Sequence, residues 1–314
     1  MDLIIHHAKC ADGWCAAYVA KKKYPEATLM PVDYGMDFTS LISACGNTHV
    51  LMVDFSFPTR EQNDLVAKTA YSFKILDHHK TAQVVLEGAP YAVFDMKRSG
   101  AGLTWDWLFG EIKLPIYRDG KPTGEFIKAA DPLPRPWYVN YVEDRDLWNW
   151  KLPESREICA YLGTLPFTTE AWDKLRDMSP EEAAELGEGA LAQIQHYVRD
   201  IVQDAKTGLL AGCKVAILNA PYLNCSEVGH ELAKTHDISL TWFEPGDGTV
   251  QFSLRSIGNF DVSAVAKRFG GGGHKNAAGF KLSLLEGRKL IDQIHGRKGE
   301  LAASYAEREP GGCV

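Results

Sequence analysis

The chain contains 314 residues, enough for two domains of ordinary size. Hydrophobic residues make up 45% of it and aromatic residues 11%, with eight tryptophans, so a disordered chain and a small disulfide-stapled scaffold are both excluded. The 34 basic and 41 acidic residues give a net charge of −7, which excludes a globally basic surface for duplex nucleic acid.

The first 80 residues alternate short apolar runs with helical segments. We expect strands at 2–7, 28–34, 49–55 and 73–76, and helices at 13–24 and 60–70. Pro31 weakens the second of these strands, because proline cannot donate a ladder hydrogen bond. Strands and helices alternating at this spacing predict a parallel α/β sheet with short crossovers.

Side chains that can bind metal follow the ends of three of these strands. They are His6, His7, Asp12, Asp54, Asp77, His78 and His79. Ligands of open parallel sheets bind outside the carboxyl ends of the strands, so we expect these seven residues at one edge. One aspartate there is more often a helix cap and one histidine a polar edge residue, but their joint occurrence favours a centre of two divalent cations.

The middle of the chain is expected to be mostly helical. We expect a helix over 98–109, a proline-rich surface insertion over 110–136 with a hairpin turn at 117–121, and a second helix ending near Val142. Ser179-Pro180-Glu181-Glu182 is typical of a helix N-cap within the helix-forming segment 169–207. The expected organisation is a metal-binding catalytic domain over 1–178, a helical linker over 179–208, a smaller α/β domain over 209–296 and a frayed tail over 297–314.

A run of four glycines, 270–273, marks the second domain. Such a run lets the backbone approach a ligand closely and turn its N–H groups toward an anion. Phe269 and Phe280 flank the run and indicate a packed turn rather than a flexible linker. Arg255 is a second candidate phosphate clamp, although an isolated arginine is as often an ordinary surface residue.

Cysteine usage and hydropathy bear on the compartment. The seven cysteines include no CxxC pair, and no signal peptide is evident, so we expect reduced thiols in a cytoplasmic protein. No apolar run approaches the ~20 residues of a membrane span. We expect no membrane association, and the sequence leaves open whether the chain forms a homodimer.

Asp77-His78-His79 together with the glycine run up to Gly279 resembles the DHH phosphoesterases that carry a DHHA1 second domain. The segments CADGWCAA, VDFSF and EDRDLW resemble most the branch of nano-RNA hydrolases (oligoribonucleases) and cyclic-nucleotide phosphodiesterases. The resemblance implies two Mn²⁺ ions, with Mg²⁺ or Co²⁺ as substitutes, in the DHH domain. It also implies that the DHHA1 domain holds the substrate phosphate and base across an interdomain cleft.

The resemblance further implies a role for each matching residue. The implied metal ligands are His7, Asp12, Asp54 as the bridging carboxylate, His78 and Asp144, with Asp146 as the alternative to Asp144 and His6 competing with His7. Asp77 would orient His78, and His79 would contact the phosphate or protonate the leaving oxygen. The implied substrate contacts are Arg98, Ser99, Arg255, Gly272, Gly273 and His274.

Cys10 departs from the family pattern, which has an aspartate in many members at this position. Either one metal site lacks a carboxylate, or a thiolate replaces it and softens the metal preference. A third interpretation is that Cys10 is a buried structural cysteine, and this is the one that we expect.

Together with this resemblance, the sequence predicts a Mn²⁺-dependent phosphodiesterase that hydrolyses short single-stranded oligonucleotides to nucleoside monophosphates. Long nucleic acid would require an extended basic groove with stacking aromatic residues; Trp148 and Trp150 are more easily read as core residues. Alternative substrates are cyclic mono- or dinucleotides, 3′,5′-bisphosphate nucleotides and polyphosphate. A non-catalytic nucleotide-binding module is the alternative from another class.

Overall fold

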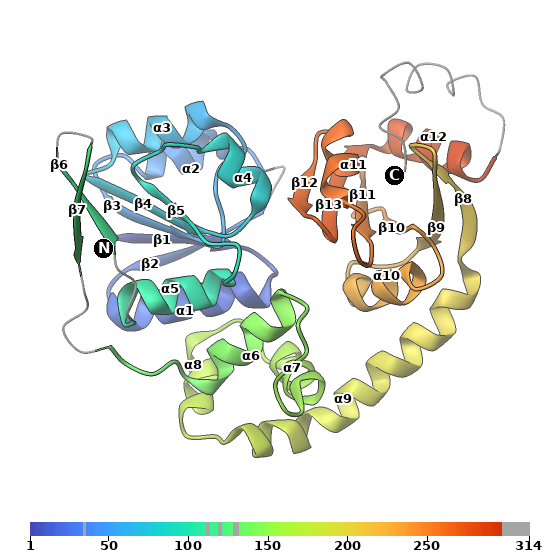
Figure 1. The fold of residues 1–314 in the computed structure, drawn as a ribbon, viewed down its shortest axis with the longest axis horizontal. Helices are drawn as coiled ribbons and strands as arrows, with labels where there is room; N and C mark the ends of the chain where they lie inside the picture. Colours follow the sequence, from blue (N-terminus) through green and yellow to red (C-terminus); the bar gives the residue numbers. More distant parts are fainter. Residues whose placement is uncertain (34–35, 111–113, 119–120, 128–131, 297–314) are drawn as a thin grey trace. The chain divides into compact units, whose positions relative to one another are not determined.

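The computed structural model describes residues 1–33, 36–110, 114–118, 121–127 and 132–296. The chain forms two compact units, Met1–Leu191 and Ala192–Val314 (Figure 1). The tail expected at 297–314 and residues 119 and 120 of the expected hairpin turn lie outside the described residues. Among the residues that are described, no helix is long and apolar enough to cross a lipid bilayer.

The first unit is built on a five-stranded sheet. Its strands are β1 (Leu3–His7), β2 (Thr28–Val32), β3 (His49–Val53), β4 (Ser72–Asp77) and β5 (Ala92–Phe94). They lie in the order β2-β1-β3-β4-β5, and every neighbouring pair is parallel. Pro31 is tolerated because β2 is an edge strand. The structure thus confirms the predicted parallel α/β sheet.

Helices cover both faces of this sheet, as Figure 1 shows. They are α1 (Ala11–Lys23), α2 (Phe38–Ala44), α3 (Arg60–Thr69), α4 (Lys80–Val85) and α5 (Gly100–Leu108). Ile4 of β1 packs into the core beneath α1 and α5, whereas its neighbours Leu3 and Ile5 pack with Phe38 of α2 and Val66 of α3. Successive strand residues face opposite sides, which explains why each strand is a continuous apolar run.

A hairpin and a group of helices complete the first unit. They are β6 (Leu114–Arg118), β7 (Lys121–Ile127), α6 (Trp137–Asp146), α7 (Ser155–Thr164), α8 (Thr169–Asp173), η1 (Lys174–Arg176) and α9 (Pro180–Ile201), the last of which continues into the second unit. Strands β6 and β7 are antiparallel, in agreement with the predicted hairpin. Ser179 and Glu182 exchange the two hydrogen bonds of a capping box at the start of α9, as predicted.

The predicted end of the second helix near Val142 is wrong by about one turn, because α6 continues to Asp146. The loop that follows the helix folds back onto the carboxylate of Asp144, and the side chains of Tyr138 and Tyr141 on α6 are buried.

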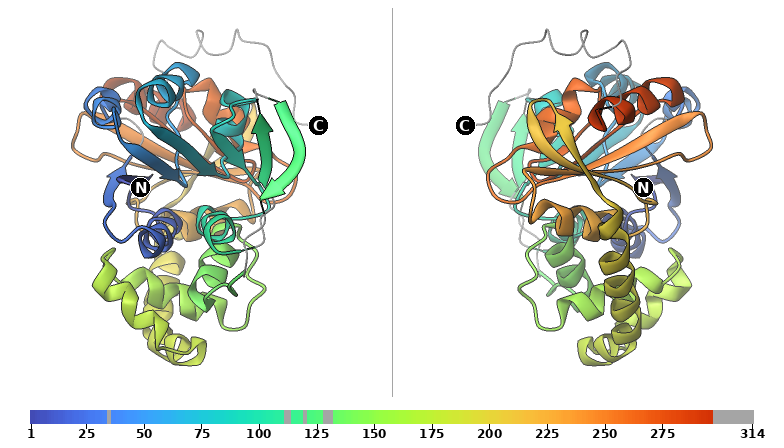
Figure 2. Two further views of the ribbon diagram at one scale, coloured as in Figure 1. Left: turned by 90° about the vertical axis from the view of Figure 1, so that its left-hand side faces the viewer. Right: turned by 90° about the vertical axis from the view of Figure 1, so that its right-hand side faces the viewer.

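The second unit contains a six-stranded mixed sheet. Its elements are η2 (Val202–Asp204), β8 (Lys206–Leu210), β9 (Cys213–Asn219), α10 (Cys225–Ala233), β10 (Ile238–Phe243), β11 (Thr249–Arg255), α11 (Val262–Arg268), β12 (Gly272–His274), β13 (Ala277–Ser283) and α12 (Leu284–Ile294). The strand order is β12-β13-β11-β10-β9-β8. Helices α11 and α12 cover one face and α10 the other (Figure 2), which confirms the predicted second α/β domain.

Candidate metal centre

The strand order of the first unit changes direction between β1 and β3. Chain segments leave these neighbouring strands toward opposite sides of the sheet, and such switch points are where open α/β sheets bind ligands. The side chains that meet here come from the ends of β1, β3 and β4 and from the starts of α1 and α4. They are His7, Cys10, Asp12, Asp54, Asp77, His78 and His79.

Asp54 lies at the middle of this cluster. Its Oδ1 is 3.1 Å from His78 Nε2, and its Oδ2 is 3.6 Å from His7 Nδ1. The residue is 1% exposed, and Oδ2 accepts no hydrogen bond from any described residue. Burial alone would raise the pKa of Asp54, but His7 and His78 hold that pKa well below its usual range. Asp54 is therefore a buried carboxylate that stays ionised.

The backbone of Asp54 adopts an uncommon conformation. Its φ of 53° lies in the left-handed region, which few residues other than glycine, asparagine and aspartate adopt readily. Such outliers persist where the surroundings hold them in place, often at functional sites. Here the Asp54 N–H donates to Leu76 O of β4 at 2.9 Å, so the turn that aims the carboxylate is tied to the sheet.

Asp12 sits in the first turn of α1, and the start of α5 holds it. Its carboxylate oxygens accept the N–H groups of Gly100 at 2.6 Å and Ala101 at 2.9 Å, the unpaired amides at the positive end of a helix dipole. Even so, burial and the nearby carboxylates of Asp54 and Asp146 raise the pKa of Asp12 well above its ordinary value. The site concentrates more negative charge than its own hydrogen bonds offset.

Asp77 orients the two histidines that follow it. Its Oδ1 accepts the backbone N–H groups of His78 (2.7 Å) and His79 (3.2 Å) and the Nδ1–H of His79 (2.7 Å). Its Oδ2 accepts the hydroxyl of Ser56 at 2.9 Å. His78 Nε2 lies 3.5 Å from Asp12 Oδ2. Although burial acts to lower it, Asp146 and Asp54 raise the pKa of His78 well above its usual value.

Asp146, not Asp144, reaches the cluster. Asp146 Oδ2 is 3.5 Å from His78 Nε2, is shielded from solvent, and accepts no hydrogen bond within the described part of the chain. The carboxylate of Asp144 instead accepts the N–H groups of Lys151 (3.0 Å) and Leu152 (3.3 Å) and the hydroxyl of Ser155 (2.6 Å). Our preference for Asp144 is therefore corrected. Asp144 closes the loop after α6, and Asp146 faces the site.

Successive side chains of β1 point to opposite faces of the sheet, and this separates His6 from His7. His6 is 4% exposed and packs against Trp14 of α1, with ring centroids 5.9 Å apart, and burial lowers its pKa. His7 turns toward Asp54 and Phe55. Burial again acts to lower the pKa of His7, but Asp54 raises it well above the usual value. Of the two imidazoles, the structure places that of His7 in the cluster.

The donor set fits divalent cations. One ligand atom from each of Asp12, Asp54 and His78 lies within 4.8 Å of the others, and the same holds for His7, Cys10 and Asp54. Asp54 is shared by both sets, as a bridging carboxylate would be. Two of the carboxylate oxygens, on Asp54 and Asp146, are buried with no hydrogen-bond donor in the described residues. A bound cation is one way in which buried oxygens of this kind are compensated.

The residues at the start of α5 make contacts within the first unit. Ser99 caps the helix by accepting the N–H of Gly102 at 3.1 Å, and Asp12 takes the next two amides. The guanidinium of Arg98 forms ion pairs with Asp95 and Asp106. Its side chain is 35% exposed, so a substrate phosphate would have to compete with these carboxylates. Phosphate binding by Arg98 and Ser99 stays a prediction.

The candidate substrate residues of the second unit lie near the ends of β11 and β12. Arg255 donates to Ser226 Oγ at 2.7 Å and to Leu254 O at 2.8 Å. Ala277 of β13 pairs with Arg255 on one side and His274 on the other. Directly paired residues share a face of a sheet, and strands are ~4.8 Å apart, so Arg255 and His274 share one face about 10 Å apart.

The glycine run forms an edge strand rather than only a turn. Gly272 and Gly273 belong to β12, which pairs with β13. Gly273 has a φ of 136°, and a Cβ there would lie 2.5 Å from Ala277 O, so close strand approach by itself requires glycine. The predicted packing of the flanks is present, because the rings of Phe269 and Phe280 stack with centroids 4.5 Å apart. Anion binding by Gly272 and Gly273 stays a prediction.

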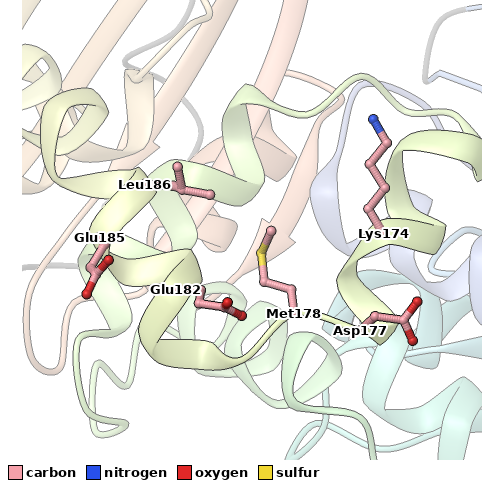
Figure 3. A pocket seen from close by; sticks show the side chains of 6 residues that line it. All are labelled: Lys174, Asp177, Met178, Glu182, Glu185 and Leu186. Carbon is pink, nitrogen blue, oxygen red and sulfur yellow. The ribbon is translucent and has the colours of Figure 1, made fainter.

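A separate surface hollow lies between η1 and the start of α9. It is lined by Lys174, Asp177, Met178, Glu182, Glu185 and Leu186 (Figure 3). Glu182 is engaged in the cap of α9, and the Leu186 side chain is 58% exposed. The hollow contains none of the predicted site residues, and we assign it no part in function.

Four similarities to known proteins bear on these findings. Residues 222–297 match the model of the DHHA1 domain. Uncharacterized protein R106 of Acanthamoeba polyphaga mimivirus is 26% identical over 322 residues, covering 94% of this chain and 70% of that protein. The crystal structure of RecJ from Thermus thermophilus in complex with Mn²⁺ has a TM-score of 0.54 at 16% identity and covers 94% of this chain. The chain spans about half of RecJ, 51% of that structure.

A solved structure of the pGpG-specific phosphodiesterase PggH from Vibrio cholerae matches 95% of this chain and 100% of its own, with a TM-score of 0.46 and 12% identity. The RecJ similarity shows a shared fold, and the DHHA1 match adds the second domain. The chain therefore contains a DHHA1 domain over residues 222–297 and carries Asp77-His78-His79 at the end of β4 of its first unit.

Proposed function

We propose that this protein is a two-metal phosphodiesterase that hydrolyses short single-stranded oligonucleotides to nucleoside monophosphates, with Mn²⁺ as its cation. The observation that carries the proposal is the cluster of Asp12, Asp54 and Asp146 around His78, in which Asp54 belongs both to the donor set with Asp12 and His78 and to the set with His7 and Cys10. When bound, two such cations would supply a water of lowered pKa and neutralise charge on the phosphoryl oxygens.

Each ligand has a place in this scheme. His7 and Asp54 would hold one cation, and Asp12, Asp54, His78 and Asp146 the other. The Gly100 and Ala101 amides fix the Asp12 carboxylate, so this ligand is held before a cation arrives. Asp77 holds both histidines without itself being needed as a ligand, in the way that carboxylates behind metal-binding histidines do.

His79 is the residue that we assign to the substrate. Its Nδ1 donates to Asp77, and this bond fixes the tautomer and the plane of the ring. The other ring nitrogen, Nε2, would then contact the scissile phosphate or give a proton to the leaving oxygen. The side chain is 15% exposed, so it lies at the solvent-facing side of the centre, where a substrate can reach it.

Charge and the second unit support a short substrate. A net charge of −7 disfavours a long polyanion, whereas a few nucleotides need only a local anion pocket. Arg255 and His274 share one sheet face. Because β12 is an edge strand of the described sheet, one side of it has backbone groups that strand pairing does not use. We assign the terminal phosphate or base of the substrate to these residues, with Gly272 and Gly273.

Turnover with a panel of phosphodiesters tests the proposal. The parent protein is assayed in Mn²⁺ with pApA, a long single-stranded RNA, a cyclic dinucleotide, cAMP and 3′,5′-bisphosphoadenosine. Asp54→Asn and His78→Ala should abolish turnover, while Asp200→Asn, which changes an exposed aspartate of α9, should leave it unchanged. Preferential conversion of pApA to AMP is the expected result. Preference for a cyclic or bisphosphate substrate would overturn the substrate assignment, and no turnover with any of them would overturn the enzymatic assignment.

A further inference from the structure

Cys10 occupies the residue position immediately before α1. This N-cap position favours serine, threonine, aspartate or asparagine, whose side-chain oxygens accept an N–H of the first turn. The Cys10 side chain makes no such capping bond to the described residues of α1. Its sulfur instead lies within 4.8 Å of ligand atoms of His7 and Asp54. The cysteine side chain is thus directed into the metal centre.

The surroundings of Cys10 differ from those of a structural cysteine. Cys15 and Cys45 are 0% exposed and belong to apolar cores of the first unit. Cys10 is only partly buried and belongs to none of the apolar clusters that the described residues form. Our expectation of a buried structural cysteine is therefore not supported by its neighbours, which are an imidazole and a carboxylate.

A second observation at the same place points to a cation. Asp54 is 99% buried, and its Oδ2 accepts no hydrogen bond among the described residues. The nearest charged partner of that oxygen is His7 Nδ1 at 3.6 Å, beyond hydrogen-bond distance. A buried carboxylate oxygen of this kind is costly unless something positive compensates it. One nitrogen, one sulfur and one oxygen therefore surround a position that offers the ligands of a cation.

We infer that Cys10 is a thiolate ligand to the cation held by His7 and Asp54. This inference rests on the proposed metal centre. As the sulfur–metal bond forms, the thiol gives its proton to solvent, and no oxidant or reductant is involved. A mixed N, S and O donor set favours the borderline cations Co²⁺ and Zn²⁺ and the softer Cd²⁺ over Mg²⁺. This half of the centre therefore selects softer metals than the half built from Asp12, Asp146 and His78.

Cobalt spectroscopy tests the ligand directly. The full chain, freed of metal, is titrated with Co²⁺, whose visible bands report binding and whose near-ultraviolet sulfur-to-cobalt charge-transfer band reports thiolate ligation. We expect that band in the parent protein and in Cys225→Ser, a control that removes another partly buried thiol, on α10. We expect it to vanish in Cys10→Ser and in Cys10→Asp.

The two Cys10 variants separate ligation from folding. Cys10→Asp should keep both cations while losing the charge-transfer band, and its preference for Cd²⁺ over Mn²⁺ should fall by at least about tenfold, the loss that removing even an outer partner of a ligand produces. A parent that binds Co²⁺ without the band, or a band that persists in Cys10→Ser, overturns the inference. Failure of the parent to bind any Co²⁺ overturns it as well.

The same experiment distinguishes the inference from the proposed function. If the band is present but no phosphodiester is hydrolysed, Cys10 is a ligand and the proposed activity is wrong. If pApA is hydrolysed in Mn²⁺ while Co²⁺ binds without the band, the activity stands and thiolate ligation is refuted.

Discussion

Replacing Gly100 by alanine should damage the metal centre through volume alone. A Cβ at this position would lie 2.9 Å from both Asp12 Oδ2 and Asp54 Cγ, and closer still to Asp54 Cβ. Ordinary contacts begin at about 3.5 Å, so Asp54 Cβ must be displaced by about 1 Å, and Asp12 Oδ2 by about 0.6 Å, relative to the new methyl group. Working constellations tolerate displacements of about 0.5 Å, and about 1 Å can cost ~10²-fold in rate.

We therefore expect Gly100→Ala to weaken Mn²⁺ binding and to lower turnover of pApA by about 10²-fold, with a loss of ~1–3 kcal/mol in the free energy of unfolding. The matched control is Gly163→Ala in α7, where a Cβ meets no described heavy atom within 4 Å and alanine stabilises the helix by up to about 1 kcal/mol. Calorimetric Mn²⁺ titration, turnover and thermal unfolding are measured on both variants. Unchanged Mn²⁺ affinity in Gly100→Ala would refute the reasoning.

Three further predictions follow from the same geometry. Asp146→Asn should weaken Mn²⁺ binding with little change in stability. Asp144→Asn should keep Mn²⁺ binding and lower the free energy of unfolding by ~1–3 kcal/mol, because Asp144 accepts two backbone amides and a hydroxyl. The opposite pattern in titration calorimetry and thermal unfolding would restore Asp144 as the ligand. Because the pKa values of His78 and Asp12 are raised in the metal-free chain, these groups hold protons above their usual pH ranges and must release them to bind a cation. Mn²⁺ affinity should therefore rise as the pH rises through the raised pKa of His78. Binding near neutral pH should release protons, which calorimetric titrations in buffers of different ionisation enthalpy detect. Equal heats of binding in all buffers would contradict the expected proton release. Mn²⁺ at about 100 times its dissociation constant should stabilise the protein by ~2.7 kcal/mol, measured as a rise in Tm that EDTA reverses, and Asp54→Asn should show no such rise.

The sequence predicted the sheet of the first unit and the edge where its polar residues meet. Short apolar runs that each end in a polar residue have few readings other than buried parallel strands. The register of β1 with β3 then follows from burial on both faces, which places Asp54 and the end of β1 side by side. The positions of Asp12, Asp54 and His78 in one cluster were predictable for this reason.

Other parts depended on tertiary contacts that no local pattern encodes. Asp144 and Asp146 are two residues apart on α6, about 200° around the helix, so only one can face the sheet, but only the structure shows which. The choice between His6 and His7 likewise depends on where β1 ends. The direction in which the Cys10 side chain points was also not predictable, because it depends on Asp54 lying beside it.

In the second unit, two features were misread or missed. The residues flanking the glycine run led us to predict a packed turn, whereas Gly272–His274 form the strand β12, in which the close approach of β13 requires Gly273. Helix α12 is absent from the predicted elements, although Ser283 and Glu286 form a capping box at its start. A search for capping boxes along the whole sequence would have found it.

The left-handed backbone of Asp54 has a practical consequence for capturing a substrate. A residue at this φ of 53° can be exchanged for asparagine or glycine with little conformational cost, whereas β-branched and bulky side chains meet a steric penalty. Asparagine also keeps an oxygen that can occupy the Oδ1 position beside His78. The backbone itself therefore selects Asp54→Asn as the variant in which a bound nucleotide can be crystallised uncleaved, with the surrounding residues close to their native positions.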